Sequence, residues 1–351
     1  MKRLLQIPEY LEDVHYVASL DLPWEKLCNK TILITGGTGL IGSFLIDVLA
    51  AVNLNCTVLL LGRSEDKAKI RFAEYWNDEW LRFVKWDASD SCKPQVEEPV
   101  DFVLHLASNT HPVAYATDPI GTITTNVLAL NNLLALAAEK NSERFLFASS
   151  NEIYGENRGD AELFDEKYCG YIDCNTLRAG YPEAKRCGEA LCQAYIKQKG
   201  LDCVIARLTR TYGPTILSTD TKAISQFFNN ALMGEDIVLK SEGRQYYSYQ
   251  YVSDSVSGLL TVLLKGVRGE AYNIADESGD ITLRDLATLI ANLAGRKVVF
   301  ELPDAVESVG FSKATKARLD GSLIRKLGWK PFYSNKYGVA RTMSCLYKER
   351  N

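Results

Sequence analysis

The chain has 351 residues, of which 46% are hydrophobic and 24% charged, and its formal net charge is −4. This composition is typical of an ordinary soluble globular protein, and it indicates neither a nucleic-acid-binding surface nor a basic membrane-binding face. No apolar run approaches the roughly 20 residues that span a bilayer, so we expect neither nucleic acid nor membrane as a partner.

Residues 1–28 form a polar N-terminal extension, MKRLLQIPEYLEDVHYV onward, in which Pro8, Glu9 and Glu12 interrupt any apolar signal core. We therefore expect a cytoplasmic protein. Nine cysteines, an odd number without a C-x-x-C pair, favour reduced thiols. All three histidines precede residue 112, which makes a histidine zinc site or a Ser-His-Asp triad hard to assemble, and we predict no metal.

Apolar strand patterns alternate with helical patterns over the next part of the chain. Strands are predicted near residues 31–35, 56–64, 82–89, 100–108, 144–155 and 202–214, with helices near 40–51, 124–140 and 180–195. Such alternation predicts an α/β fold with a parallel sheet covered on both faces. We expect a Rossmann-type, doubly wound NAD(P)-binding domain over residues 29–214.

The alternation loosens from about Thr215. Helical patterns at 223–235 and 253–266 flank an aromatic strand pattern at 244–252, and a tail dotted with lysine and aspartate follows. Residues 215–351 are therefore expected to form a smaller substrate-binding α/β lobe, with some segments returning to the main domain.

A glycine-rich turn joins the first predicted strand to its helix. Gly36, Gly39 and Gly42 form G-x-x-G-x-x-G at that junction, where glycine permits a tight turn and lets a pyrophosphate approach the helix N-terminus. A purely structural turn is the alternative. With the first helical residues, Leu40 and Ile41, these glycines are the predicted core of a dinucleotide site.

The end of the second predicted strand bears on cofactor choice. A site that selects NAD usually has an acidic residue there for the ribose hydroxyls, whereas this chain has Arg63 and Ser64. The pair favours NADP slightly, because it would hold a 2′-phosphate. If the alignment shifts by a residue or two, Glu65 or Asp66 would serve NAD instead.

Tyr181 and Lys185 lie four residues apart, about one helical turn, so they would project from one face of a helix. Pro182 is tolerated in the first helical turn. A nearby ammonium favours the phenolate, which makes such a tyrosine a credible acid/base. With 18 tyrosines in the chain, however, the spacing can also arise by chance.

The succession of motifs resembles the extended short-chain dehydrogenase/reductases that modify nucleotide-linked sugars. It runs TGGTGLIG, Asp87 of KWDAS, HLASNTHP, DPIGTITTNVLALNNLL, ASSNEIYG, YPEAK, RTYGP, YQYVSDSVSGLL and LGWKP, over nearly the whole chain after residue 28. The resemblance implies a nucleotide-diphosphate sugar as substrate and a homodimer formed through helices near 120–140 and 181–197. It also implies cofactor contacts at Asp87, Ala88, Ala107 and Ser108, in addition to the glycine turn.

By the same resemblance, Ser150, Tyr181 and Lys185 are the catalytic trio. Tyr181 would take the hydroxyl proton while hydride leaves the sugar carbon for nicotinamide. Lys185 would lower the pKa of the tyrosine and hold the nicotinamide ribose, and Ser150 would hydrogen-bond the reacting oxygen.

Glu152 indicates the reaction type. Dehydratases and uronate decarboxylases of this family carry a glutamate at its position, whereas plain 4-epimerases commonly carry a neutral residue there. If the strand continued past Ser150, Glu152 two residues on would face the same side. Asn151 stands where many 4,6-dehydratases have an aspartic acid, and an amide cannot protonate a leaving hydroxyl.

The remaining comparisons point in both directions. YCGYIDCNTLRAGYPEAKR looks like the segment before the tyrosine in UDP-glucuronate decarboxylases, yet Lys222 aligns with their catalytic arginine. Arg210 replaces the family's usual asparagine, and Tyr247 replaces its phosphate-binding arginine, which suggests that Arg210 supplies the missing charge. The predicted substrate-binding residues are Asn109, Asn151, Arg210, Lys222 and Tyr247.

The sequence thus predicts an NAD(P)-dependent enzyme that oxidises a nucleotide-sugar at C4 and then eliminates water or carbon dioxide. A nucleotide-sugar 4-epimerase is the alternative within the same family. A non-catalytic NAD(P)-binding sensor or structural protein is the alternative from another class, although such a protein has no need of the intact trio Ser150, Tyr181 and Lys185.

Overall fold

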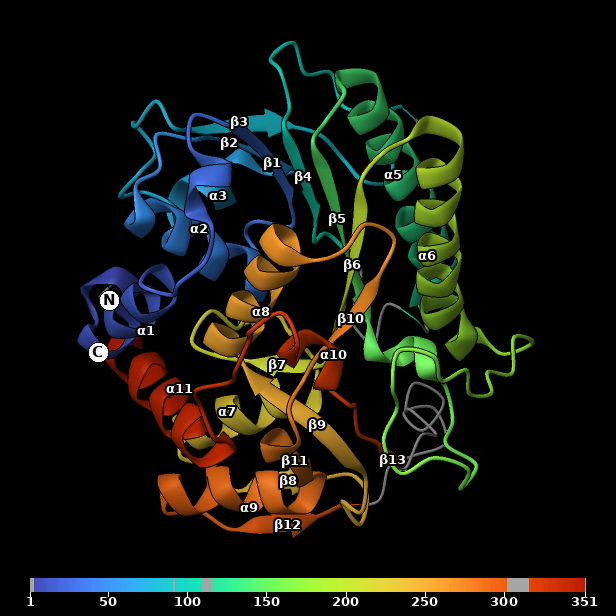
Figure 1. Cartoon of the computed structure of the whole chain (residues 1–351). Coiled ribbons are helices and arrows are strands. Elements are labelled where there is room, and N and C mark those ends of the chain that lie inside the picture. Colours follow the sequence, from blue (N-terminus) through green and yellow to red (C-terminus); the bar gives the residue numbers. More distant parts are fainter. Residues whose placement is uncertain (1–2, 91, 109–114, 116, 302–315, 351) are drawn as a thin grey trace.

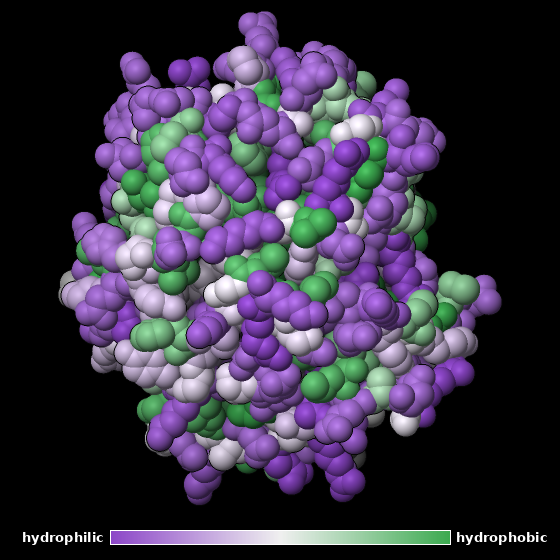
Figure 2. All heavy atoms as spheres, viewed as in Figure 1, coloured by the Kyte–Doolittle hydropathy of each residue, from purple (hydrophilic) through white to green (hydrophobic). Residues whose placement is uncertain are grey.

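The structure is a computed structural model that describes residues 3–90, 92–108, 115, 117–301 and 316–350 (Figure 1). Asn109, one of the predicted substrate-binding residues, lies outside the described residues. Figure 2 shows that hydrophilic side chains cover most of one face of the molecule, with hydrophobic side chains scattered among them.

The large sheet has seven parallel strands in the order β10-β6-β5-β4-β1-β2-β3. They are β1 (Thr31–Thr35), β2 (Thr57–Gly62), β3 (Leu81–Lys85), β4 (Phe102–His105), β5 (Arg144–Ser150), β6 (Cys203–Leu208) and β10 (Ala271–Ile274). Strand order reverses between β1 and β4, and open sheets of this kind bind ligands beyond the carboxyl ends of the strands at that point. The predicted doubly wound α/β fold is confirmed.

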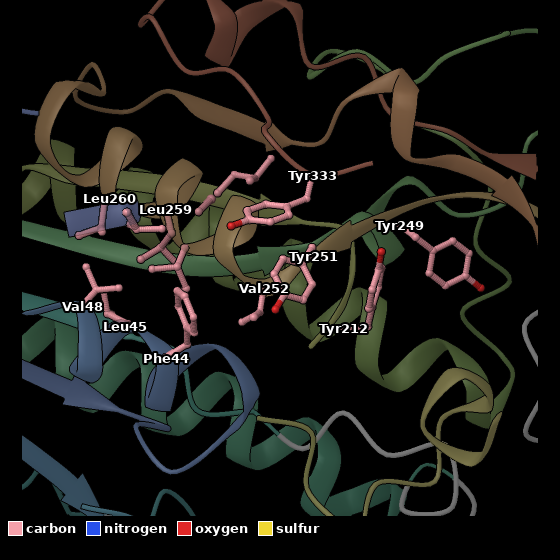
Figure 3. Close-up of a cluster of buried hydrophobic side chains, with 14 of the residues drawn as sticks. Phe44, Leu45, Val48, Tyr212, Tyr249, Tyr251, Val252, Leu259, Leu260 and Tyr333 are labelled. Carbon is pink, nitrogen blue, oxygen red and sulfur yellow. The ribbon is translucent and has the colours of Figure 1, made fainter. Parts of the chain in front are cut away.

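Helices cover both faces of this sheet (Figure 1). On one face lie α2 (Leu40–Val52), α3 (Glu65–Arg71) and α8 (Val252–Lys265), and on the other α5 (Pro119–Lys140) and α6 (Gly180–Lys199). Side chains of β1 alternate between the two cores, since Ile32 and Ile34 belong to one buried cluster and Leu33 to the other. Figure 3 shows part of the first cluster, where Phe44 and Leu45 of α2 face Leu259 and Leu260 of α8.

Helix α5 is long and apolar enough, by its 22 residues and composition, to cross a membrane, which the sequence reading had not anticipated. In the fold this helix packs against α6 and the strands β4 and β5. Its Leu130, Leu133 and Leu134 are fully buried in the second core, as expected for the core helix of a globular domain.

A smaller layer holds most of the chain after β6. It contains β7 (Arg210–Tyr212), α7 (Ala223–Met233), β8 (Ile237–Leu239), β9 (Tyr246–Tyr251), β11 (Asp280–Thr282), α9 (Leu283–Ala294), β12 (Val298–Phe300), β13 (Lys316–Ala317), α10 (Ser322–Arg325) and α11 (Asn335–Arg350). Strand β9 pairs with β7, β11 and β13. By contrast, α8 and β10 return to the large sheet, where β10 pairs with β6.

The N-terminal helix α1 (Pro8–Ala18) packs on α2, α8 and α11, so segments from both ends of the chain lie side by side (Figure 1). Its Asp13 is fully buried and accepts hydrogen bonds from the hydroxyls of Tyr251 at 2.6 Å and Tyr333 at 2.5 Å. Asp13 also pairs with Arg341 of α11 at 2.8 Å. The predicted N-terminal extension is therefore an integral part of the packed fold.

Candidate active site

Two glycines of the β1–α2 turn are required by the chain's own packing. Gly36 has φ +72°, and a Cβ there would lie 2.7 Å from the backbone nitrogen of Ala107. A Cβ on Gly42 would lie 2.4 Å from the carbonyl oxygen of Gly36. These positions therefore seat the turn against the loop after β4, where the Thr35 hydroxyl accepts a hydrogen bond from the Ala107 N–H at 3.1 Å.

Gly39 differs, because its φ of −85° and ψ of 178° suit any residue. A Cβ there would meet only the Gly36 carbonyl oxygen, at 3.2 Å. Gly39 is the N-cap of α2, so the helix begins at Leu40 and Ile41 with backbone N–H groups that have no intrahelical acceptor. A bare glycine before a helix N-terminus fits a pyrophosphate that needs close backbone approach. The residues present thus suit a dinucleotide.

The predicted adenosine-side residues lie on two adjacent strand ends. Gly62 of β2 pairs with Lys85 of β3, which places Arg63 and Ser64 beside Asp87 and Ala88. Arg63 is exposed, whereas the Ser64 hydroxyl already caps α3 by accepting from the Lys67 N–H at 3.3 Å. Of the two side chains, the exposed Arg63 is therefore the better placed to contact a ligand.

Strand β5 ends at Ser150, and Asn151–Tyr154 form a 3₁₀ turn. The expectation that Glu152 shares a strand face with Ser150 is therefore wrong, because the chain no longer has the two-residue repeat of a strand. The turn is fixed by the Ser150 hydroxyl, which accepts from the Glu152 N–H at 3.2 Å. Glu152 nevertheless belongs to the site, since its charge acts on Tyr181. Asn151 is buried in the same turn.

Helix α6 begins at Gly180 and carries Tyr181 and Lys185 on its buried side. The Lys185 ammonium donates to the Ala148 carbonyl at 2.9 Å and lies 4.8 Å from the centre of the Phe147 ring. It lies 5.8 Å from the centre of the Tyr181 ring. The predicted spacing therefore brings both side chains together at the carboxyl end of β5.

Burial raises the pKa of Tyr181 to about 12, although interactions with the hydroxyls of Ser150 and Ser108 act in the opposite direction. The expectation that Lys185 lowers the pKa of Tyr181 stays a prediction. Burial also lowers the pKa of Lys185, to about 7, which weakens its positive charge at neutral pH.

His105 of β4 stacks on Phe147, the ring that also lies near the Lys185 ammonium. Its Nδ1 is 2.8 Å from the Thr35 hydroxyl, and its ring stacks on Phe147 at 6.0 Å. Burial, and then the nearby charge of Lys185, lower the pKa of His105 to about 3. The imidazole is therefore neutral at physiological pH and joins β1 to β4 through its hydrogen bond with Thr35.

Two residues near Tyr181 were missed in the sequence. Tyr115 is buried and stacks on Tyr181, with ring centres 5.3 Å apart and an interplanar angle of 23°. The Arg178 guanidinium lies 5.0 Å from the centre of the Tyr115 ring and forms an ion pair with Glu152. The position of Arg178, three residues before Tyr181, was the available clue, whereas Tyr115 comes from a distant part of the chain.

The predicted substrate-side residues fall into two groups. Arg210 of β7 stacks on Tyr247 of β9, with its guanidinium 3.6 Å from the ring centre, so the structure brings together the two positions predicted to have exchanged roles. Lys222 is the N-cap of α7 and pairs with Asp220 at 3.4 Å. The charge of Asp220 in turn acts on Tyr115, which places this pair near the catalytic end of the site.

Among the described residues, no group of three or more histidine, cysteine, aspartate or glutamate side chains is placed to hold a metal ion. None of the nine cysteines forms a disulfide within the part of the chain that the structure describes. Ser150, Tyr181, Lys185 and Glu152 remain the predicted catalytic residues of the site.

The strand order, the glycine turn and these side chains define a class of protein, the Rossmann-fold oxidoreductases of the extended short-chain dehydrogenase/reductase type. More narrowly, the chain belongs to the NAD dependent epimerase/dehydratase family, whose family model matches residues 32–275. The resemblance seen in the sequence is confirmed.

Several named proteins are similar to this chain. It is 32% identical to UDP-glucuronic acid decarboxylase 1 of Danio rerio over 330 residues, which cover 92% of this chain and 73% of that protein. It is 31% identical to UDP-glucuronic acid decarboxylase 6 of Arabidopsis thaliana over 317 residues, covering 89% and 87%.

Solved structures share the fold. A dTDP-glucose 4,6-dehydratase from Streptomyces venezuelae, solved with NAD bound, has a TM-score of 0.77 at 26% identity and covers 91% of this chain and 97% of its own. A UDP-glucose 4-epimerase from Thermotoga maritima has a TM-score of 0.77 at 24% identity, covering 92% and 100%.

We predict that Lys185→Met stabilises the protein at pH 6 in the absence of any dinucleotide. A fall in lysine pKa from 10.5 to about 7 corresponds to roughly 4–5 kcal/mol of free energy, borne by the folded state while the ammonium is charged. Between pH 7 and 10.5 the unfolded chain binds more protons at this lysine than the folded chain, so wild-type stability rises with pH. The advantage of the variant should therefore shrink by roughly 2–3 kcal/mol from pH 6 to pH 9.

Urea unfolding of both proteins at the two pH values measures this difference. Lys197→Met is the matched control, because Lys197 is exposed on the same helix, and its effect should be small and equal at both values. A variant less stable than wild type at pH 6, or a difference independent of pH, would contradict the burial of a charged Lys185.

Proposed function

We propose that this protein is an NAD(P)-dependent enzyme that oxidises a nucleotide-linked uronic acid at C4 and then releases carbon dioxide. The observation that carries the proposal is the Glu152–Arg178 ion pair beside Tyr181, since transient oxidation and re-reduction alone need no further charged pair. Similarity to UDP-glucuronic acid decarboxylases over about nine-tenths of the chain supports decarboxylation. A 4,6-dehydratase and a 4-epimerase are the alternatives.

The chain's own residues account for the proton and electron movements. When bound, the dinucleotide supplies a reversible hydride acceptor. Tyr181 takes the proton of the C4 hydroxyl as that carbon becomes a ketone, and Ser150 donates a hydrogen bond to the same oxygen. When the C5–C6 bond breaks, its electron pair moves onto the C4 oxygen, where both hydroxyls stabilise the enolate charge. Carbon dioxide leaves with the aid of the Glu152 carboxylate, and C5 takes a proton. The hydride then returns to C4 as Tyr181 gives its proton back to the C4 oxygen, so the dinucleotide and the tyrosine end as they began.

Lys185 has a separate part in this scheme. Its ammonium donates one hydrogen bond, to Ala148. An ammonium has three donors, so two remain for the hydroxyls of a nicotinamide ribose. Since burial already favours the neutral amine, a bound ligand that accepts these hydrogen bonds would also restore the charge on Lys185.

For cofactor choice we propose that Arg63 contacts a 2′-phosphate and favours NADP(H). Its exposure at the end of β2 supports this contact, because the guanidinium is free to move toward a phosphate. Glu65 and Asp66, in the first turn of α3, are the residues that would serve NAD(H) instead.

Equilibrium titration of protein stripped of cofactor tests this choice. We expect tighter binding of NADP(H) than of NAD(H), and Arg63→Ala should weaken NADP(H) selectively, by roughly 10- to 150-fold for one charge-assisted contact. Equal or better affinity of the wild type for NAD(H) would remove Arg63 from this role.

We propose that Arg210 is the cation of the diphosphate side. The Nη1 group of Arg210 is buried without a hydrogen-bond partner in the described part of the chain, and stacking on Tyr247 holds the guanidinium in place. An unpaired buried donor is costly, whereas a phosphate oxygen would satisfy it. Lys222 is proposed as a second polar contact, nearer the sugar.

Arg210→Ala should accordingly weaken binding of UDP by roughly 10- to 150-fold, as expected for one charge-assisted contact. Calorimetry with UDP alone isolates the diphosphate from the sugar. If wild type and variant bind UDP equally well, Arg210 does not touch the phosphates.

We also propose a homodimer formed through α5 and α6. The exposed apolar side chains Ile120, Ile123 and Leu128 of α5 support this arrangement, since their exposures of 76%, 44% and 47% are costly in water. Sedimentation velocity of the purified chain distinguishes a dimer from a monomer.

Glu152→Gln tests the proposed reaction. Glutamine retains size and can still accept from Arg178, but it cannot act as a base. Incubated with UDP-glucuronate, the variant should reduce bound dinucleotide, seen at 340 nm. Carbon dioxide release should fall by roughly 10²- to 10⁴-fold, because residue 152 no longer provides the charge that aids loss of the carboxylate.

Tyr181→Phe is the comparison variant, because it removes the first proton transfer and should prevent even the reduction of dinucleotide. Product mass separates the alternatives, since a decarboxylase loses carbon dioxide, a dehydratase loses water and an epimerase changes nothing. Wild-type turnover by Glu152→Gln with an unchanged product mass would establish the epimerase instead.

A further inference from the structure

The Arg178 guanidinium is incompletely paired. It comes from the 3₁₀ turn Leu177–Ala179, just before α6, and its side chain is 20% exposed. Its Nη2 group donates to the Glu152 carboxylate. Its Nε and Nη1 groups are buried without a hydrogen-bond partner in the described part of the chain. Neighbouring carboxylate and tyrosine groups raise its pKa above the ordinary value, so the charge is permanent.

These two donors carry an energetic cost that the fold itself does not relieve. A buried N–H without an acceptor loses its hydration and gains nothing, and the loss is greater for a charged group. Arginine cannot avoid this cost by losing its proton. The unused Nη1 group at the tip of this cation matches an oxyanion, whose acceptor oxygen would satisfy it.

The surroundings fix where that anion would lie. Arg178 stacks over Tyr115, which stacks on Tyr181, and the charge of Arg178 is felt at Tyr181. The guanidinium thus belongs to the end of the site where the sugar carbon reacts. The diphosphate is proposed to lie at Arg210, on the β7–β9 pair of the smaller layer. An anion at Arg178 is therefore one carried by the sugar ring.

We propose that Arg178 determines substrate specificity by binding the carboxylate of a nucleotide-linked uronic acid through Nη1. The inference rests on the proposed function and assigns its substrate selection to one residue. Glu152 is bound by Nη2 of the same guanidinium, so the cation lies between two carboxylates and screens their mutual repulsion. A neutral hydroxymethyl group at the same carbon would leave the cation poorly paired, which disfavours a hexose.

Binding measurements test the assignment independently of turnover. In a Tyr181→Phe background, where no substrate is consumed, calorimetry gives the affinities of UDP-glucuronate, UDP-glucose and UDP. We expect UDP-glucuronate to bind more tightly than UDP-glucose. Arg178→Gln should weaken UDP-glucuronate by roughly 10- to 150-fold and leave UDP-glucose and UDP within about threefold. Arg178→Lys, which retains the charge, should fall between.

Arg158→Gln is the matched control, because Arg158 also stacks on a tyrosine, Tyr171, at 3.8 Å, but is exposed and not paired with Glu152. It should leave all three affinities unchanged. The assignment is overturned if the Tyr181→Phe protein binds the two sugars equally, or if Arg178→Gln and Arg178→Lys weaken all three ligands alike.

Carbon dioxide release by the wild type is measured separately. Selective loss of UDP-glucuronate binding without any carbon dioxide release supports Arg178 as a uronate-binding residue while rejecting decarboxylation. If the wild type releases carbon dioxide but Arg178→Gln still binds UDP-glucuronate more tightly than UDP-glucose to the same degree, decarboxylation is supported and Arg178 is rejected as the uronate-binding residue.

Discussion

The burial of Lys185 is the constraint around which the site is built. The Lys185 ammonium lies near aromatic rings and has one carbonyl acceptor. Its charged form is costly there unless a bound ligand supplies further hydrogen-bond acceptors. Phe147 contacts the Lys185 ammonium and also stacks on His105. His105 in turn is hydrogen-bonded to the Thr35 hydroxyl at the end of β1. The glycine turn begins at the next residue, so the two halves of the site share one framework.

Charges at the reacting end are balanced in pairs. Glu152 is matched by Arg178, and Asp220 by Lys222. Both pairs act electrostatically on Tyr115, whose pKa is affected by the charges of Glu152, Arg178 and Asp220. A site arranged in this way has little net charge, yet it offers an oriented cation to any anion that enters. A protein stabilises a transition state through the orientation of its fixed charges rather than through their sum.

Much of this was predictable from the sequence, because the decisive features are local. The glycine turn, the strand and helix alternation and the one-turn spacing of Tyr181 and Lys185 each depend on neighbouring residues. Glu152 was predicted from the family resemblance, but the added argument that it shares a strand face with Ser150 was wrong, since the chain turns into a 3₁₀ turn after Ser150. Tyr115 stacks on Tyr181 and lies under the Arg178 guanidinium, and its burial follows from tertiary packing that has no local sequence pattern.

The helix α1 has a consequence for how the chain is made. Asp13 and Tyr333 are 320 positions apart, and Arg341, the ion-pair partner of Asp13, lies further still. At about 5–20 residues per second, the ribosome needs roughly 20–60 s to travel from one to the other. During that time the carboxylate of α1 has neither its cation nor its tyrosine donor from the end of the chain. Helix α1 therefore reaches its final packing only after Tyr333 and Arg341 have been synthesised.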